Sequence, residues 1–130
     1  MITSIHIENY ALIDCLDMDF HEGFSVITGE TGAGKSIILG AIGLLLGQRA
    51  DSKSIKPGAA KCVIEAEFDV RGRGLEAFFS SNDIDFDGST CMVRRELTSA
   101  GKSRSFVNDT PAPLAVLKEH FGFGDARPII

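Results

Sequence analysis

Eight consecutive residues near the N-terminus have the types and spacing of a loop that binds phosphate groups. They match the pattern G-x-x-x-x-G-K-[ST] at every required position and are Gly29, Glu30, Thr31, Gly32, Ala33, Gly34, Lys35 and Ser36. Glycines permit backbone conformations in which successive N–H groups point at one anion. In such a loop the lysine reaches the β- and γ-phosphates, and the last hydroxyl ligates Mg²⁺. The segment therefore predicts a nucleotide site with ATP and Mg²⁺ as ligands, in which Ser36 binds the metal.

The residues on either side of this loop predict the elements that position it. Residues 24–28 form a short apolar run that is typical of a central strand. Residues 35–46 are apolar almost all round, which predicts a helix buried on several sides. The positive end of that helix would face the phosphates. Gly40 and Gly43 each lower helix propensity by about 1 kcal/mol relative to alanine, so we expect another backbone to pack closely against them.

Other segments predict further strands and two more helices. The strands are expected at 4–8, 16–20, 61–71, 91–97 and 105–107, and the helices at 75–81 and 110–120. The first two strands are expected to form an antiparallel pair, and the last two a hairpin. In the strand 61–71 the inward side chains are expected to be Cys62, Ile64, Ala66, Phe68 and Val70. The expected fold class is α/β, a P-loop NTPase with a mixed sheet that contains antiparallel strands.

The composition of the chain indicates which kinds of partner, such as nucleic acid or membrane, are not expected. The chain has 130 residues, 44% of them hydrophobic and 24% charged, as expected for one soluble globular domain. Its net charge of −5 gives no sign of a general nucleic-acid-binding surface. The apolar run 37–46 is about half as long as a membrane span needs, so we expect no membrane partner and a cytoplasmic location. The three cysteines lack CxxC spacing and are expected to be small buried hydrophobes: Cys15, Cys62 and Cys91.

Three weaker patterns have other interpretations. Residues 83–88 copy the first half of a calcium-binding loop, but Arg94 stands where a bidentate glutamate is required, so an acidic surface turn is expected. The run Arg94, Arg95 and Glu96 either places a cation near phosphate or, as favoured here, forms a charged pair on an exposed strand. The histidines have no partners at metal-ligand spacing and are expected at the surface: His6, His21 and His120.

The order of these motifs resembles one family. The segments that carry the likeness are 7–13, 19–20, 29–51, 58–60 and 101–108. Together they resemble the RecN family of bacterial DNA repair proteins over residues 1–120. This family belongs to the structural-maintenance-of-chromosomes (SMC) class of ATPases, which are relatives of ABC transporter heads. The resemblance implies that residues 1–120 are the N-terminal lobe of an ATPase head, and that 121–130, which do not match, are an atypical tail.

The resemblance also implies partners. In this family the N- and C-terminal parts of one chain form one head, two heads sandwich ATP, and the proteins act in recombinational repair of DNA double-strand breaks. The expected partners are the C-terminal lobe of the same head, a second head in a homodimer, and DNA bound through the full protein rather than through this part. The coiled coil, the signature motif and the catalytic carboxylate are absent from this sequence. We therefore interpret it as a fragment, assign no catalytic residue, and expect it to hydrolyse ATP barely, if at all.

Two alternatives stay open at this point. A complete small P-loop kinase would use the same loop, but such kinases usually begin with the strand that feeds the loop, whereas two predicted strands precede it here. A folding or dimerisation module with a vestigial loop is the other alternative, and it predicts no binding even at millimolar ATP.

Overall fold

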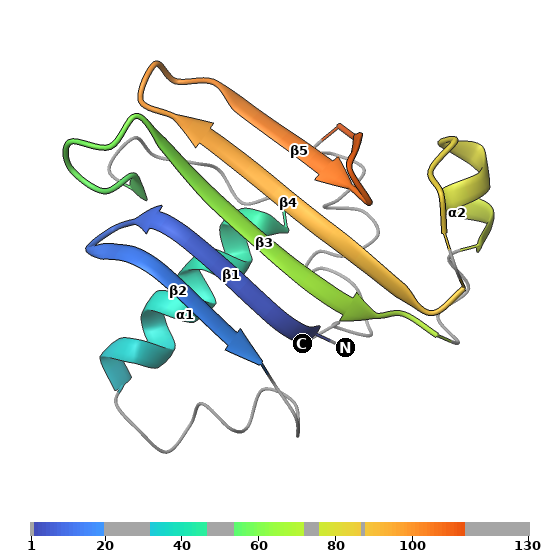
Figure 1. The fold of residues 1–130 in the computed structure, drawn as a ribbon, viewed down its shortest axis with the longest axis horizontal. Coiled ribbons are helices and arrows are strands. Elements are labelled where there is room, and N and C mark those ends of the chain that lie inside the picture. Colours follow the sequence, from blue (N-terminus) through green and yellow to red (C-terminus); the bar gives the residue numbers. More distant parts are fainter. Residues whose placement is uncertain (1, 20–31, 47–53, 72–75, 87, 114–130) are drawn as a thin grey trace.

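A six-stranded sheet forms the body of the computed structural model (Figure 1). The structure describes residues 2–19, 32–46, 54–71, 76–86 and 88–113, with the side chains of its first helix described from Ile38 onward. The strands are β1 (Ile2–Tyr10), β2 (Ile13–Asp19), β3 (Lys61–Asp69), β4 (Thr90–Thr98), β5 (Ser103–Val107) and β6 (Thr110–Pro111). The helices are α1 (Gly32–Leu45) and α2 (Glu76–Ser81). The strand order is β2-β1-β3-β4-β5-β6, and every neighbouring pair is antiparallel.

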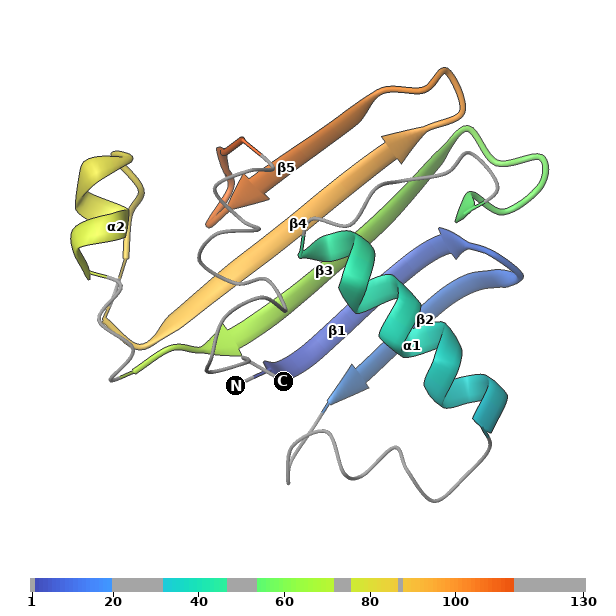
Figure 2. The same ribbon diagram turned by 180° about the vertical axis from the view of Figure 1, so that it is seen from behind.

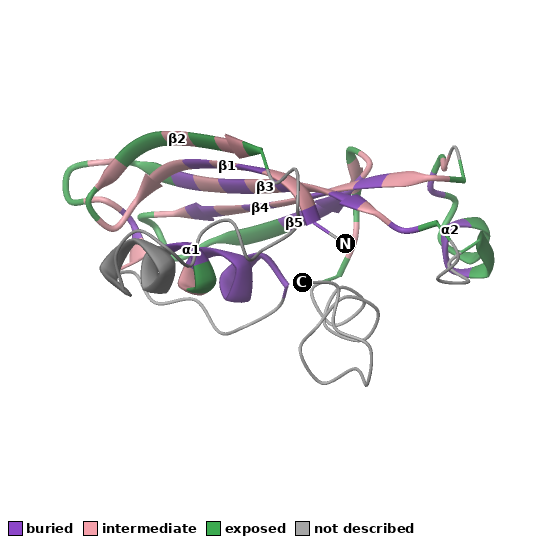
Figure 3. Ribbon diagram, turned by 90° about the horizontal axis from the view of Figure 1, so that it is seen from below, coloured by how far each residue is buried: buried purple, intermediate pink, exposed green. Residues whose placement is uncertain are grey.

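The two helices have different places relative to the sheet. Helix α1 lies across one face of the sheet, with its C-terminal end against β3 and β4 (Figure 2). Helix α2 lies beyond the end of the sheet at which β3 ends and β4 begins. No described helix covers the opposite face (Figure 3), which we call the open face. Within the described part of the chain, no helix is long and apolar enough to cross a membrane.

The core lies between the sheet and α1. In β3 the burial alternates along the strand, and the side chains facing α1 are at most 1% exposed: Cys62, Ile64, Ala66 and Phe68. The predicted alternation is thus confirmed, because a pleated strand sends successive side chains to opposite faces. From α1 the buried partners are Ile38, Ala41, Ile42, Leu44 and Leu45. Burying each large aliphatic side chain contributes about 1.5–3 kcal/mol.

Two predicted elements are not confirmed by the structure, one strand and one helix. The predicted strand 24–28 lies outside the described residues, and the described sheet is antiparallel throughout rather than mixed. The predicted helix at 110–120 is wrong at its start, because Thr110 and Pro111 form β6. Asn108 and Asp109 both have positive φ, 49° and 64°, the pair of left-handed residues that makes a tight hairpin turn. The turn brings Thr110 opposite Val107, and residues 114–120 lie outside the described part.

The described part of the acidic segment, residues 83–86 and 88, lies outside the helices and strands, as expected of a surface turn. Asp83 and Asp85 are exposed, and Asp83 and Gly88 have positive φ. The segment is fixed by its apolar residues, because Ile84 is buried and the ring of Phe86 stacks on Phe79 at 4.0 Å between centroids. The carboxylates of Asp83 and Asp85 are not among the described groups that lie close enough together to share a cation.

Candidate nucleotide-binding site

Helix α1 begins inside the predicted phosphate loop. Residues 32–36 form its first turn, so the second half of the loop lies at the N-terminal end of the helix, as predicted. The helix starts three residues before the predicted position and ends at Leu45. The first half of the loop, Gly29, Glu30 and Thr31, lies outside the described residues, as do the side chains of Lys35 and Ser36. The first turn contains no acidic residue, so no carboxylate of its own neutralises the positive end of the helix dipole.

The middle of α1 is fixed by contact with the sheet. Ala41, Ile42 and Leu45 are completely buried, and they recur at the three- and four-residue spacing of one helical face. A helix of 14 residues is about 21 Å long. Packing along this length therefore determines where the N-terminal end, and with it the predicted loop, is placed.

The C-terminal end of α1 is fixed by Arg95. This residue of β4 faces the helix and is 2% exposed. Its Nη1 donates a hydrogen bond of 2.6 Å to the Leu44 carbonyl, and its Nε donates one of 3.2 Å to Ser103 Oγ. A cation here complements the negative end of the helix dipole and binds a carbonyl that lacks a partner within the helix.

Arg95 therefore corrects the prediction of an exposed charged pair. Burial lowers the pKa of Arg95, yet a guanidinium remains charged because its pKa starts far above neutrality. The alternative interpretation, a cation beside phosphate, is also wrong for this side chain. Arg95 binds one end of α1, and the described part of the predicted phosphate loop lies at the other end, about 12–18 Å along the helix from Leu44.

Gly40 accommodates Tyr10 rather than a backbone segment. A Cβ atom at Gly40 would lie 2.6 Å from the hydroxyl oxygen of Tyr10. Asn9, with φ 55°, lies directly before the tyrosine at the end of β1. Burial raises the pKa of the Tyr10 phenol. The expectation that a backbone segment packs against this glycine is therefore wrong at Gly40, because the group that approaches closely is an aromatic side chain from the hairpin of β1 and β2.

The open face carries most of the charged side chains of the sheet. Arg94, the neighbour of Arg95, points to this face, where its Nη1 lies 3.5 Å from Glu65 Oε2 and its Nε lies 3.2 Å from Glu96 Oε2. Its guanidinium also covers the ring of Phe106 at 4.4 Å. The predicted charged pair is therefore present for Arg94 and Glu96, but the strand is not exposed there, because the two side chains are only 25% and 17% exposed.

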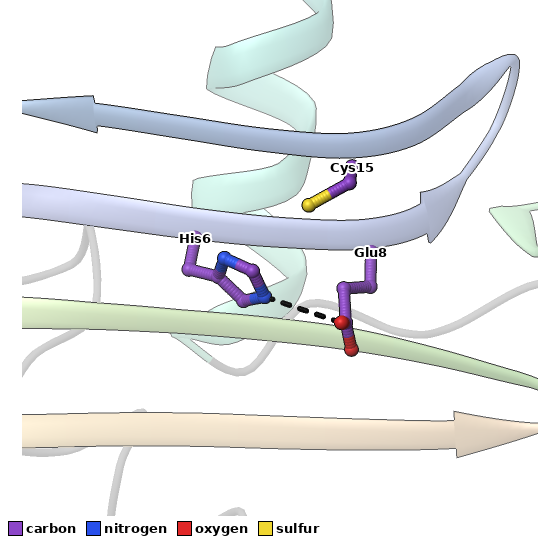
Figure 4. Close-up of side chains that lie close together, drawn as sticks. All are labelled: His6, Glu8 and Cys15. Carbon is purple, nitrogen blue, oxygen red and sulfur yellow. Dashed lines mark ion pairs between the residues drawn. The ribbon is translucent and has the colours of Figure 1, made fainter.

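The same face brings together side chains that the sequence analysis kept apart. His6, Glu8 and Cys15 lie on β1 and β2 with their ligand atoms within 4.8 Å of one another (Figure 4). Cys62 and Cys91 are buried as expected, but Cys15 is exposed, so the prediction of burial is wrong there. His6 is half-buried and does have neighbours with metal-ligand chemistry. The signal that would have found them is one polar residue at every second position on both strands of the first hairpin.

The fold and its comparisons with known proteins define the class of this protein. A solved SMC ATPase structure, from work on ATP-driven dimerization and DNA-stimulated activation of SMC ATPases, superimposes with a TM-score of 0.71 at 23% identity, covering 92% of this chain and 76% of that chain. The fold is thus that of the N-terminal lobe of an SMC-type ATPase head. Residues 4–115 match the model of the AAA domain family, and the chain belongs to that family.

Curated relatives indicate a more specific family. The chain is 36% identical over 118 residues to the DNA repair protein RecN of Vibrio cholerae, and 38% identical over 122 residues to that of Haemophilus influenzae. These alignments cover 91% and 92% of this chain but only 21% and 22% of the relatives. The resemblance to the RecN family predicted from the sequence is confirmed, and the chain spans about a fifth of the length of these proteins.

Proposed function

We propose that residues 29–36 bind ATP with Mg²⁺. Backbone N–H groups of the loop and of the first turn of α1 would bind the phosphate oxygens. The Lys35 ammonium would contact the β- and γ-phosphates, and the Ser36 hydroxyl would ligate the cation. No residue of this chain is assigned to activate water, so its role is to bind and orient the nucleotide.

One observation carries the proposal, namely that α1 begins within the motif. The middle of the helix is buried against the sheet, and its C-terminal end is bonded to Arg95. The N-terminal end has no acidic residue in its first turn. A helix fixed in this way keeps its N–H donors in position before the anion arrives, so little ordering is required when the nucleotide binds.

For the whole protein we propose a RecN-like ATPase in recombinational repair of DNA double-strand breaks. Residues 1–120 would be the N-terminal lobe of its head, and residues 121–130 a separate tail. The lobe would pair with a C-terminal lobe of the same head, and two heads would form a homodimer around ATP. The expected location is the cytoplasm, with DNA contacted by the assembled protein. The likeness to RecN and to an SMC ATPase described as dimerising with ATP supports this assignment.

A thermal-shift titration with Mg-ATP tests the nucleotide site. Ligand at a hundredfold excess over its dissociation constant should stabilise the chain by about 2.7 kcal/mol, and Lys35→Ala should abolish the shift. Lys102→Ala is the matched control, because Lys102 is exposed in the turn between β4 and β5. An equal shift in the Lys35→Ala variant would refute the assignment. A Ser36→Ala variant should lose the part of the shift that depends on Mg²⁺.

Two further measurements separate this proposal from its alternatives. Phosphoryl transfer to a small acceptor in a coupled assay would favour a kinase, whereas the RecN-like assignment predicts none. The chain should also bind duplex DNA poorly, since its net charge is −5 and non-specific DNA affinity depends on cationic contacts to phosphates. Tight, salt-sensitive binding of duplex DNA by this chain would contradict that expectation.

A further inference from the structure

Four side chains form a square on the open face, across β1 and β2. His6 lies directly opposite Asp17, and Glu8 lies directly opposite Cys15. Residues two apart on a strand share a face, and directly opposite residues have Cβ atoms about 5 Å apart. The strand register therefore places a nitrogen, a sulfur and two carboxylates side by side. In Figure 4 the sulfur of Cys15 extends from β2 toward His6 and Glu8 on β1.

The distances between the three potential ligand atoms are close to those between the ligand atoms of a metal site. Their ligand atoms lie within 4.8 Å of one another. In a tetrahedral zinc site, with bonds of about 2.0–2.3 Å, neighbouring ligand atoms are about 3.3–3.8 Å apart. Side-chain rotations that move the ligand atoms by about 1–1.5 Å close this difference. Cys15 is exposed and His6 and Glu8 are partly exposed, so an ion can reach all three.

Asp17 holds the imidazole in the orientation that a metal requires. His6 Nδ1 lies 2.5 Å from Asp17 Oδ1, while Nε2 lies 3.5 Å from Glu8 Oε1. With the proton on Nδ1 donated to Asp17, the lone pair of Nε2 points to the side of Glu8. A carboxylate behind a histidine ligand is the arrangement that fixes tautomer and ring orientation in metal sites. Asp17 is thus a positioning residue rather than a ligand.

We propose that His6, Glu8 and Cys15 form a binding site for Zn²⁺ or a similar borderline divalent cation. The thiolate and imidazole favour such an ion over Mg²⁺ and Ca²⁺, which prefer oxygen ligands. One thiolate and one carboxylate neutralise its two positive charges, and the fourth coordination position is left for water. The ion would join β1 to β2 and so stabilise the first hairpin. This site is on the open face, and Figure 4 shows α1 behind the strands that carry it, so it does not depend on the proposed nucleotide site.

Cobalt titration of the metal-stripped chain tests the proposal. Co²⁺ should bind with one equivalent and produce the near-ultraviolet absorption of a cobalt–thiolate bond, and Zn²⁺ should displace it even with excess Mg²⁺ present. Cys15→Ser should abolish this absorption. Asp17→Asn should weaken binding by about 10–100-fold, as outer-shell partners do. Asp19→Asn, on the same strand and face, is the matched control and should leave the affinity unchanged.

Alkylation of Cys15 gives a second readout. Among the three cysteines it alone is exposed, so iodoacetamide should modify it in the native chain, and one equivalent of Zn²⁺ should slow that reaction. Protection should disappear in His6→Ala, whose unfolding temperature without metal should match the parent. The proposal is overturned if the cobalt absorption is missing in the parent or persists in Cys15→Ser. It is equally overturned if Zn²⁺ protects Cys15 to the same extent in His6→Ala.

Discussion

The two faces of the sheet are built from alternate residues of the same strands, but they differ in how they use charge. On the face under α1, Arg95 is the only charged residue among the described buried side chains. Its guanidinium binds the last turn of the helix. On the open face charged residues are paired both across and along strands, since Arg94 of β4 contacts Glu65 of β3 and Glu96 of its own strand.

This difference shows on which face the loss of a charged side chain should destabilise the fold and on which face it should have little effect. A buried donor that satisfies a buried carbonyl is costly to remove, because the carbonyl is then left without a partner. Pairs on a solvated face contribute at most about 1 kcal/mol each. The covered face therefore determines the position of α1 and its predicted phosphate loop. The open face can vary in charge and remains accessible to ions.

The largest expected difference between the faces comes from shortening one side chain on each. Ile64→Ala removes a side chain that is 1% exposed beneath α1, so unfolding free energy should fall by about 2–5 kcal/mol. Val63→Ala, on the open face of the same strand and only partly buried, should cost about 1 kcal/mol or less. Urea unfolding measures both changes. Similar losses in the two variants would show that the open face is also covered in solution.

Replacing Arg95 tests the charge that is buried under α1. Arg95→Met keeps much of the volume but leaves the Leu44 carbonyl without its donor, and we expect a loss of about 1–3 kcal/mol in urea unfolding. Arg104→Ala is the control, because Arg104 is exposed on β5, and its effect should stay near 0.5 kcal/mol. A variant Arg95→Met as stable as the parent would mean that the hydrogen bond to α1 contributes nothing measurable.

A double-mutant cycle tests the contact between Gly40 and Tyr10. Alanine at Gly40 gains about 1 kcal/mol of helix propensity, but its Cβ would meet the tyrosine hydroxyl at 2.6 Å. Without that oxygen the nearest tyrosine atom is a ring carbon at 3.8 Å, an ordinary contact. Gly40→Ala should therefore be neutral or destabilising in the parent and stabilising in a Tyr10→Phe background. Equal effects in both backgrounds would exclude coupling between the two residues.

The smallest effect is expected at the exposed pair of Asp69 and Arg71. Hydrogen bonds from the Arg71 side chain and backbone lower the pKa of Asp69 from 3.8 to about 2. Because the folded pKa is depressed, the associated stability is present above pH 3.8 and is lost as pH falls toward 2. Carboxyl NMR should find Asp69 ionised at pH 3 in the parent, and half protonated near 3.8 in Arg71→Ala. Titration of Asp69 near pH 3.8 in the parent would show that the pair does not form in solution.

Most of the sheet could be predicted from the sequence because strands have a local signature. The alternation around Ile64 predicted β3 with the correct inward side, and the hairpin of β4 and β5 was also expected. The start of β6 could not be predicted in this way. Thr110 and Pro111 have the chemistry of a helix start, and only the left-handed turn before them decides that the chain pairs with β5.

The candidate sites were predictable to different degrees. The motif of the proposed phosphate loop is contiguous, so residues 29–36 can be recognised as a candidate nucleotide site without any tertiary information. The group of His6, Glu8 and Cys15 is dispersed over two strands, and its members become neighbours through the register of β1 and β2. Alternation predicts which residues share a face, but it does not predict which ones stand opposite each other.

The sequence by itself determined the phosphate-loop motif on which the proposed site rests, the buried helix that follows it and the inward faces of the strands. Each of these depends on residues close together in the chain, where the period of the backbone alone sets the pattern. Only the tertiary structure decided that Arg95 binds Leu44, 51 positions earlier, and that Cys15 is exposed beside Glu8. The physical reason is that the crossing of α1 over the sheet and the register of its strands minimise the free energy of the whole core, so local sequence patterns do not determine them.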